Sequence, residues 1–319
     1  MYFSGITQAL MWKEMTPEGV LKYPNFVNTV VQIIPMYYIR AFGGIIYLLG
    51  AILMAYNLLK TAQQGQLVRE EEASAPALVE GQKESSGHKW LEGRAVPFFL
   101  FTAIAIVTGG IVEIAPSVLA ETIKPTEALV KPYTALELEG RDLYIREGCN
   151  NCHSQMIRPF INETLRYGKA SEAGDYVNDH PFLWGSKRTG PDLLRIGGKY
   201  NNAWHFNHMK NPTDTSVGSI MPKYDWMFVN KLDFNLTSSK MKALRLVGVP
   251  YTDEEIDNSM VAVKLQADAI VADLKKTETK PNEYQVEWNN EIIAMIAYLQ
   301  ILGKRVENTK PESKSEVNK

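Results

Sequence analysis

Two long apolar runs divide the chain. Residues 41–59 carry no ionisable side chain, and residues 96–120 carry only Glu113. At about 1.5 Å of rise per residue, the first run reaches about 28 Å, which matches the roughly 30 Å hydrocarbon core of a bilayer, and the second run is longer. Residues typical of a membrane interface flank the first run: Tyr37, Tyr38, Arg40 and Lys60. The pattern predicts two transmembrane helices, at about 41–59 and at 96–120.

Polar or short segments surround these runs. Residues 61–95 are rich in Glu, Gln, Ser and Ala, which is the composition of a linker. The opening stretch MYFSGITQALMW is apolar but too short to cross a membrane, so we interpret it as the remainder of a helix or as an interfacial segment. The charged stretch 306–319 is predicted to be disordered.

Residues 133–303 have the pattern of a small helical domain. Thr134 and Glu137 form a T-x-x-E capping box, and apolar or small residues follow at helical spacing: Leu136, Gly140 and Leu143. These features predict a first helix. Residues 162–222 are rich in Gly, Pro, Asn and Asp and are expected to be mostly loop.

Two more helices are predicted in the second half of this domain. Thr252 and Glu255 form another capping box, which opens an amphipathic helix. Its apolar positions are expected to share one face: Ile256, Met260, Val263, Ala267 and Ile270. The last helix is predicted at about 287–302, with Gly303 as the residue that stops it.

Composition and charge exclude some classes of function. The formal net charge is −2 and the pI is near 6.3, and no basic block alternates with aromatic residues, so nucleic-acid binding is not expected. The mean hydropathy of −0.19 is typical of a soluble protein only because it averages over the two apolar runs. Neither run has the position and flanks of a cleaved signal peptide.

Both cysteines of the chain lie three positions apart, and a histidine follows the second. The spacing C-x-x-C-H at Cys149, Cys152 and His153 is the attachment signature of a c-type haem. The two thiols form thioethers with the haem vinyl groups, and the adjacent imidazole binds the iron from one side. We therefore predict one covalent haem c, with His153 as an iron ligand.

Two other sites compete for these cysteines. A redox-active C-x-x-C belongs at a strand–helix junction of a βαβ unit, whereas a helix is predicted before Cys149. A zinc site could combine both cysteines with His205 and His208, but this H-x-x-H spacing is shorter than usual and leaves His153 without a role. Haem is preferred because it accounts for both cysteines and for the adjacent histidine.

A second iron ligand is expected among the remaining methionines and histidines. Met221 lies about seventy residues after the motif, beyond a loop-rich stretch, and Pro222 fixes the backbone beside it. A thioether ligand raises the haem potential, as a cytochrome that passes electrons to an oxidant requires. Met221 is the preferred candidate, although a methionine can also simply fill a core. The alternatives are Met209, Met227, His205 and His208.

The haem also predicts the topology. Haem is attached covalently outside the bacterial cytoplasm, so the part after residue 120 is expected in the periplasm. The loop 60–95 then faces the cytoplasm, in agreement with its Lys and Arg content, and His88 cannot be a ligand. Glu113, inside the second run, is either a functional group satisfied by another helix or ion, or a residue that reaches the interface.

Four stretches of the sequence together indicate a protein family: YIREGCNNCHSQMIRPF, GSKRTGPDLLRIGGKY, SIMPKYDW and GGIVEIAP. Over roughly residues 90–303 they resemble the membrane-anchored mono-haem cytochrome c subunit of cbb3-type cytochrome c oxidases. The resemblance implies a class I cytochrome c-like domain in which Cys149 and Cys152 carry the haem. His153 and Met221 would then be the two axial ligands. The Pro191 carbonyl would accept the His153 ring N–H and so orient the imidazole.

The first ninety residues resemble a different subunit. GITQALMW and YYIRAFGGIIYLLGAILMAYNLLKT are similar to the C-terminal end of the catalytic subunit of the same oxidase. Residues 1–60 are therefore expected to be that end, joined by the cytoplasmic linker 61–95 to the anchor helix 96–120 and the cytochrome domain 133–303. This is the order of a fused catalytic-plus-cytochrome chain that begins partway through its catalytic part. The histidines that bind the b haems and copper have no counterpart, so this chain alone is not expected to reduce oxygen.

The expected fold class is mainly α, with two transmembrane helices and a periplasmic class I cytochrome c-like domain. The resemblance implies an electron-relay subunit of a cbb3-type terminal oxidase in the bacterial inner membrane. Its expected partners are the haem–copper catalytic subunit, a di-haem cytochrome c subunit or other c-type donor, and membrane lipid. The alternative is a free-standing membrane-anchored cytochrome c that serves another oxidoreductase. The short connection 123–133 and the pair Gly109–Gly110, which suits close helix packing, favour the docked subunit.

Overall fold

The computed structural model describes residues 2–65, 87–119, 130–185, 187–278 and 282–304. This described part is helical and contains no β-strand; its extended pairings include two isolated bridges, Met15 with Leu21 and Lys231 with Asn290. The predicted mainly α class is confirmed to that extent. The tail 306–319 and most of the predicted linker 61–95 lie outside the described residues.

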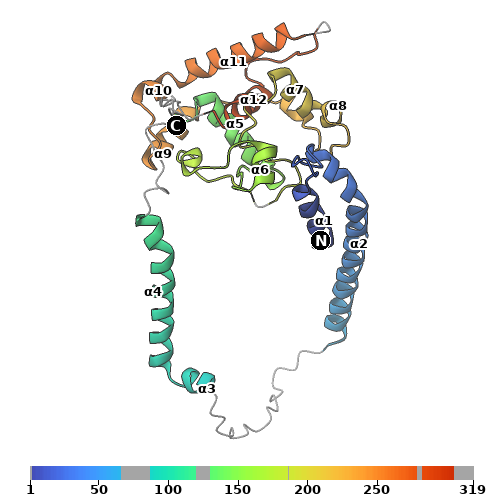
Figure 1. Cartoon of the computed structure of the whole chain (residues 1–319), viewed down its shortest axis with the longest axis vertical. Helices are drawn as coiled ribbons and strands as arrows, with labels where there is room; N and C mark the ends of the chain where they lie inside the picture. Colours follow the sequence, from blue (N-terminus) through green and yellow to red (C-terminus); the bar gives the residue numbers. More distant parts are fainter. Residues whose placement is uncertain (1, 66–86, 120–129, 186, 279–281, 305–319) are drawn as a thin grey trace. The chain divides into compact units, whose positions relative to one another are not determined.

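The helices follow one another along the chain as Figure 1 shows. The α-helices are α1 (Tyr2–Lys13), α2 (Phe26–Gln64), α3 (Gly87–Glu92), α4 (Ala95–Leu119), α5 (Ala135–Arg146), α6 (Ile161–Tyr167), α7 (Asn202–Lys210), α8 (Pro212–Thr215), α9 (Thr237–Leu246), α10 (Asp253–Asp257), α11 (Ser259–Lys276) and α12 (Glu291–Ile301). Short 3-10 turns are η3 (Cys149–Asn151), η4 (Ala173–Tyr176) and η5 (Asp225–Phe228). Residues 1–40 and 125–319 form one compact unit, and residues 41–124 form the other.

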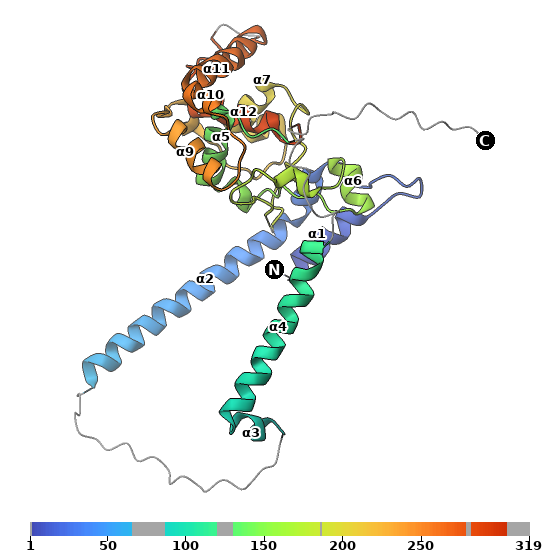
Figure 2. The same ribbon diagram turned by 90° about the vertical axis from the view of Figure 1, so that its left-hand side faces the viewer.

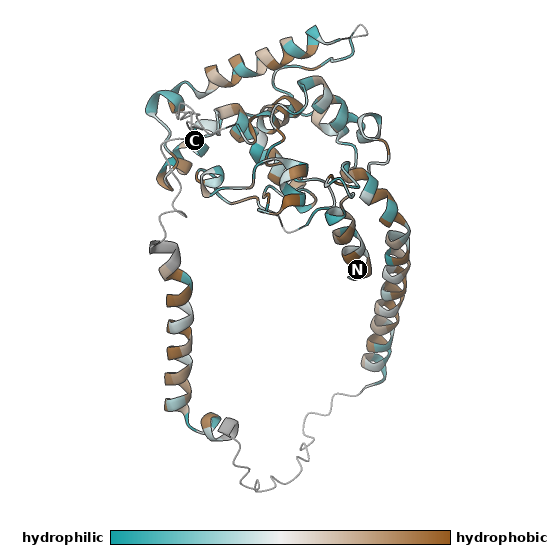
Figure 3. Cartoon of the chain, viewed as in Figure 1, coloured by the Kyte–Doolittle hydropathy of each residue, from teal (hydrophilic) through white to brown (hydrophobic). Residues whose placement is uncertain are grey.

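Within the described residues, two helices have the length and composition needed to cross a membrane, α2 and α4. Apolar side chains recur along both helices (Figure 3), and none of the residues in their most apolar windows is buried within the chain. Exposed apolar surface is unfavourable in water by about 25 cal/mol per Å². Lipid or other protein is therefore expected to cover them, and both predicted spans correspond to candidate membrane helices.

The helix α2 begins much earlier than the predicted span 41–59. The side chain of Asn25 accepts a hydrogen bond from the amide of Val27 at 3.0 Å, which satisfies one of the unpaired amides at the helix start. The first turns then bury one face, whereas the residues after Arg40 are almost all exposed. The buried residues of α2 are Phe26, Thr29, Val30 and Ile33.

The core of the larger unit lies where α5 crosses α12, in the upper part of Figure 1. The predicted capping box at the start of α5 is present, with Thr134 and Glu137 each bonded to the other's backbone. Nearly the whole of α12 is buried. Its Tyr298 ring lies against the ring of Tyr133, just before α5, and against the ring of Tyr144 on α5. Burial of this kind stabilises the domain mainly through the hydrophobic effect.

Gly140 sets the distance between these two helices. A Cβ atom at this position would lie 2.0 Å from the carbonyl oxygen of Ala294 and 2.8 Å from Cβ of Tyr298. No side chain fits at such distances, because the clash is with helix backbone that cannot move independently. The close approach of α5 and α12 therefore depends on glycine at this point.

The predicted helix from Thr252 is broken into two. Its capping box is present, but α10 ends at Asp257 and α11 starts at Ser259, with Asn258 between them at φ −91° and ψ 10°. The break changes which residues share a face, so the assignment of Met260 to the buried face is wrong: Met260 is 48% exposed. Ile256, Val263 and Ala267 are buried as predicted.

The last helix begins four residues later than the predicted 287, at Glu291. The side-chain amide of Asn290 donates to the carbonyl oxygens of Phe228 and Asn230, both at 3.2 Å, and holds the residue in an extended conformation. At the other end, Gly303 adopts φ 80°, as expected for the residue that stops a helix.

We predict that Gly140→Ala destabilises the domain by at least about 1–3 kcal/mol, since the two helices must separate to admit a methyl group. Thermal unfolding of the detergent-solubilised chain measures this loss. Gly174→Ala is the matched control, because its Cβ would meet only Val130 at 3.8 Å, an ordinary contact. Equal melting temperatures for the two variants would contradict the role given to Gly140.

Candidate functional site

The two cysteines and the histidine lie on one tight turn. After α5 ends, Gly148 adopts φ 69° and turns the chain into η3, which begins at Cys149. The amides of Cys152 and His153 both donate to the carbonyl oxygen of Cys149, at 3.1 and 2.9 Å. Both thiols are free; Cys149 is buried and Cys152 is exposed. The turn thus presents two thiols and an imidazole within a single helical turn of one another.

The electrostatics of Cys149 do not suit a redox-active dithiol. Burial, together with the nearby charge of Glu147, raises the pKa of the Cys149 thiol to about 12. Redox-active C-x-x-C cysteines instead have a lowered thiol pKa, because the thiolate is the reactive species. A helix and a 3-10 turn surround the motif, and no strand is present in the described residues.

His153 is held by the backbone of a distant loop. Its Nδ1 lies 2.8 Å from the carbonyl oxygen of Pro191. A carbonyl oxygen only accepts, so Nδ1 carries the proton and Nε2 keeps a lone pair, which is the form of histidine that binds a metal. Burial lowers the pKa of the His153 imidazole, and the Pro191 carbonyl and the Asp192 carboxylate act in the opposite direction.

The loop approaches the imidazole so closely that only glycine fits beside it. A Cβ atom at Gly190 would lie 2.3 Å from Cε1 and 2.7 Å from Nδ1 of His153. The amide of Gly190 donates to the carbonyl oxygen of Cys152 at 2.9 Å, which fastens the loop to the motif. The ring of His153 is thereby confined between its own turn and the Pro191 loop.

The loop that carries Met221 lies beside the two cysteines. Met221 is half-buried and packs against the core cluster that includes Cys149. Burial, and then the proximity of Cys149 and Cys152, raises the pKa of Tyr224 on the same loop to about 12. The amide of Tyr224 donates to the carbonyl oxygen of Met209 at 3.0 Å, which ties this loop to the end of α7.

The competing ligands have different environments. Met227 is fully buried in the core and Met209 is 7% exposed, so both already serve as packing residues. His208 has a partner, since its Nδ1 lies 2.6 Å from the hydroxyl of Thr215. His205 is 2% exposed, and its Nε2 has no hydrogen-bond partner among the described residues. Desolvation lowers the pKa of each of the two histidines to about 4, which leaves both neutral.

These residues fit a covalently attached haem. Two free thiols at the attachment spacing, an imidazole with Nε2 available, and a methionine loop next to the thiols supply the donor set that such a group needs. The zinc alternative has no support in the described residues, which contain no group of three or more metal-binding side chains.

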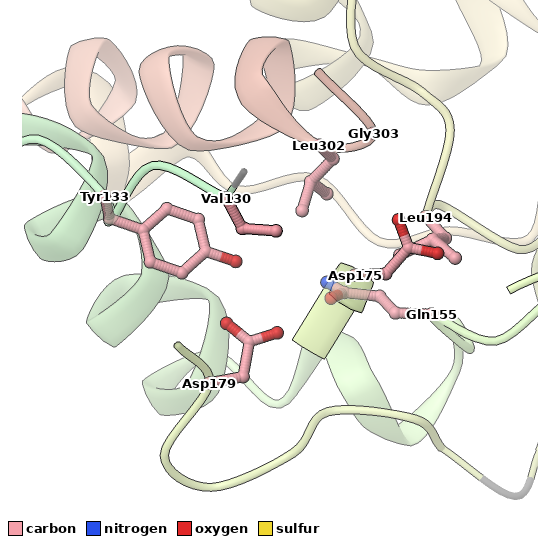
Figure 4. Close-up of a pocket in the computed structure, with 8 residues that line it drawn as sticks. All are labelled: Val130, Tyr133, Gln155, Asp175, Asp179, Leu194, Leu302 and Gly303. Atoms are coloured by element: carbon pink, nitrogen blue, oxygen red, sulfur yellow. The ribbon is translucent and has the colours of Figure 1, made fainter. Parts of the chain in front are cut away.

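A small cavity lies on another side of this region (Figure 4). Its volume of about 10 Å³ is enough for a single water molecule. Gln155, Asp175 and Asp179 direct polar groups toward it, and it contains none of the predicted site residues. It is therefore separate from the cysteine–histidine turn.

Sequence reasoning missed a buried polar cluster behind the Pro191 loop. Its members are Ser154, Glu163, Arg188 and Asp192, all at most 9% exposed. Three of these residues lie in the stretches that carry the family resemblance, but nothing in their local spacing shows that they meet. The cluster brings together side chains up to 38 positions apart, as the bond from Ser154 to Asp192 shows.

Comparison with known proteins finds one family that covers most of the chain. The family described as “Cytochrome C oxidase, mono-heme subunit/FixO” matches residues 88–306. This range is close to the residues 90–303 over which the sequence resembles the mono-haem subunit, and it includes all the predicted site residues. The resemblance to that subunit is therefore confirmed.

Curated relatives match a shorter part of the chain. “Cytochrome c oxidase subunit 1 homolog, bacteroid” of Bradyrhizobium diazoefficiens is 48% identical over 66 residues, which are 21% of this chain and 12% of that protein. “Cytochrome c oxidase subunit 1” of Rhodobacter capsulatus is 39% identical over 77 residues, 24% of this chain and 14% of that protein. “Cbb3-type cytochrome c oxidase subunit CcoN1” of Stutzerimonas stutzeri is 38% identical over 63 residues, which are 20% of this chain and 13% of that protein. The chain thus spans only about an eighth of the length of these relatives.

We predict that Met221→Ala removes the weak red absorption band of a sulfur–iron bond in the oxidised protein. The midpoint potential should also fall, because a thioether ligand favours ferrous iron. Optical spectra and a redox titration measure both effects.

Met227→Ala is the matched control for this prediction. Because Met227 is fully buried, its truncation should reduce the free energy of unfolding by about 2–5 kcal/mol and leave the band in place. A band that survives in Met221→Ala and disappears in Met227→Ala would reverse the assignment.

Proposed function

Because the chain belongs to the FixO family of mono-haem cytochrome c oxidase subunits, we propose that it is the electron-relay subunit of a cbb3-type terminal oxidase. The observation that carries the proposal is the C-x-x-C-H turn whose histidine is oriented by the Pro191 carbonyl. In this role the chain passes electrons to a haem–copper catalytic subunit during aerobic respiration. The chain itself contributes the relay and not the oxygen-reducing site.

Each site residue has a specific part in this proposal. Cys149 and Cys152 would hold one haem c through thioethers, and Nε2 of His153 would bind its iron. Met221, on the loop beside the cysteines, would supply the second iron ligand. The bound haem supplies a one-electron couple. The protein holds the imidazole in one orientation and, through the choice of a thioether ligand, raises the potential.

The proposed topology follows from covalent attachment. Residues 133–303 form the cytochrome domain and face the periplasm, while the linker 61–95 faces the cytoplasm. The spans at about 41–59 and 96–120 place the protein in the bacterial inner membrane. The two candidate membrane helices support this arrangement.

We propose that residues 1–60 are the C-terminal end of the catalytic subunit, fused through the linker to the cytochrome part. Relatives named as subunit 1 or CcoN1 match 63 to 77 residues of this chain, far less than their own length, which is what a joined terminal piece would give. The remaining catalytic part is then the immediate electron acceptor. A di-haem cytochrome c subunit or another c-type protein is the donor.

A contact within the larger unit supports permanent docking over a free-standing carrier. Arg166 on α6 donates to three backbone carbonyl oxygens of the N-terminal segment: Tyr23 at 2.6 Å, Pro24 at 3.2 Å and Trp12 at 3.3 Å. Figures 1 and 2 both show α6 beside α1 and the start of α2. A carrier that moved between partners would not need such a contact with the segment similar to the catalytic subunit.

The covalent haem is tested by denaturing gel electrophoresis with a haem peroxidase stain. The wild-type band is expected to stain, and the double variant Cys149→Ala, Cys152→Ala is expected to lose the stain, because no thioether can form. Peroxidase activity that persists in the double variant would remove the central claim. Co-purification of a haem–copper subunit with the wild-type chain separates the docked subunit from the free-standing carrier.

Docking of the N-terminal segment is tested by cutting the proposed linker. A protease site placed within residues 61–95 separates the segment from the cytochrome part, and the two fragments are expected to co-purify in mild detergent. Arg166→Ala should weaken this association about ten- to a hundredfold, since hydrogen bonds from a charged group contribute about 1.5–3 kcal/mol. Fragment retention after affinity purification measures the effect.

Arg245→Ala is the matched control, because Arg245 pairs with the exposed Asp253 at 2.6 Å and, among the described residues, no side-chain hydrogen bond or ion pair joins it to residues 1–40. Equal retention of the N-terminal fragment in the Arg166 and Arg245 variants would show that the guanidinium contact does not fasten the segment.

A further inference from the structure

The buried polar cluster behind the Pro191 loop is organised around one arginine. Arg188 donates from Nε to the hydroxyl of Ser154 at 2.8 Å and from Nη2 to the backbone oxygen of Met156 at 2.9 Å. It also forms a two-pronged pair with Glu163, one contact of which is 2.6 Å. The ring of Tyr167 covers the guanidinium, with its centroid 5.0 Å away. Each of the three guanidinium nitrogens therefore donates to a partner within the cluster or its backbone.

Asp192 connects the Pro191 loop to the chain that follows the haem motif. Its Oδ2 accepts from the hydroxyl of Ser154 at 2.6 Å and from the amide of Met156 at 2.8 Å. Its Oδ1 accepts from the amide of Leu194 at 2.9 Å. One carboxylate thus joins residues directly after His153 to residues directly after Pro191.

Two backbone bonds complete this connection on either side of Pro191. The amide of Gly190 donates to Cys152 and the amide of Leu193 donates to Ser154, both at 2.9 Å. Pro191 itself has no N–H, so its own amide cannot fix its position. The direction of the Pro191 carbonyl, and through it the direction of the His153 ring, depends on the bonds of its neighbours.

Asp192 is the carboxylate of the cluster that is paired less closely. Glu163 takes the closer contacts of the Arg188 guanidinium, and the charge of Arg166 also acts on Glu163. Arg188 lies 3.5 Å from Asp192, farther than the 2.6 Å of its contact with Glu163. Asp192 and Glu163 are 5% and 7% exposed, so water screens their charges weakly. A buried negative charge near an iron ligand stabilises the oxidised, more positive metal.

We propose that Asp192 is a positioning residue for His153 and that its charge lowers the midpoint potential of the site. The carboxylate holds the Pro191 carbonyl against Nδ1 and adds a negative charge behind the imidazole. The proposal rests on the proposed function, because it requires a haem at His153. The site thus combines a methionine ligand that raises the potential with a buried acid that lowers it.

The test is a redox titration of the full-length protein with its covalent haem, at neutral pH. Asp192→Asn has nearly the same shape and removes the charge, so the midpoint potential should rise. The electron paramagnetic resonance signal of the oxidised form should also change, since the His153 ring is held less firmly. The rise should persist at high salt, because a buried charge is poorly screened. An unchanged or lower potential in Asp192→Asn would overturn the proposal.

Two further variants separate this role from general stability. Glu163→Gln keeps every bond of Asp192 and removes a more distant charge, so a smaller rise is expected; it also serves as the test if Asp192→Asn does not fold. Glu139→Gln removes a carboxylate that is 3% exposed and bonded to Thr237 and Lys240, away from the Pro191 loop. It should lower the melting temperature without a shift in potential.

Two further results would decide between the positioning role, a general loss of stability and the absence of a haem. Equal shifts in the Asp192 and Glu139 variants would overturn the positioning role. The haem stain of the wild-type protein is recorded before the titration, so a failure of the proposed function is recognised separately as the absence of covalent haem.

Discussion

The hydrogen bond between His153 and the Pro191 carbonyl constrains the rest of the site. An imidazole can bind a metal through Nε2 only when its proton is held on Nδ1, and here a backbone oxygen 2.8 Å away holds it. For that oxygen to arrive, the loop must press against the ring, and only glycine fits at position 190. This close approach buries polar groups of the loop, and buried polar groups need hydrogen-bond partners. The side chains of Arg188 and Asp192 on the loop bond to Glu163, Ser154 and the backbone of Met156.

The helix α6 joins this site to the N-terminal segment. Glu163 and Arg166 lie three positions apart on it, a spacing that places side chains near one another on a helix surface. Glu163 pairs with Arg188 of the loop, and Arg166 bonds to the backbone at Trp12, Tyr23 and Pro24. A short helix of seven residues thus takes part in both sets of contacts. Under the proposed function, the same element that supports the proximal loop also fixes the cytochrome domain to the part similar to the catalytic subunit.

The sequence predicted what depends on local pattern. The capping boxes at Thr134 and Thr252 follow from residues within one turn, and they are present. The predicted positions Leu136, Gly140 and Leu143 of α5 are buried, but so are most other residues of this helix. The break at Asn258 was not predicted, and a stripe continued across it misplaces Met260. The apolar run predicted only the span of α2, whereas its earlier turns from Phe26 bury a face that includes the contact of Phe26 with Trp12. The polar cluster could not be foreseen from one sequence, because Arg188 and Glu163 are 25 positions apart and no local period relates them.

The helix α2 is longer than the proposed span, and its two portions differ in exposure. If residues 41–59 span the bilayer, the preceding part of α2 from Phe26 to Arg40 extends about 22 Å beyond it. That part buries Phe26, Val30 and Ile33, whereas the portion after Arg40 exposes its side chains to lipid or other protein. The change in exposure therefore coincides with the proposed membrane surface. Residues 26–40 thus belong to the same compact unit as the cytochrome part, whereas the proposed span does not. Under the proposed function this packing keeps the segment similar to the catalytic subunit beside the relay, and a short, constant distance favours the relay because electron transfer slows steeply as the distance to the acceptor grows.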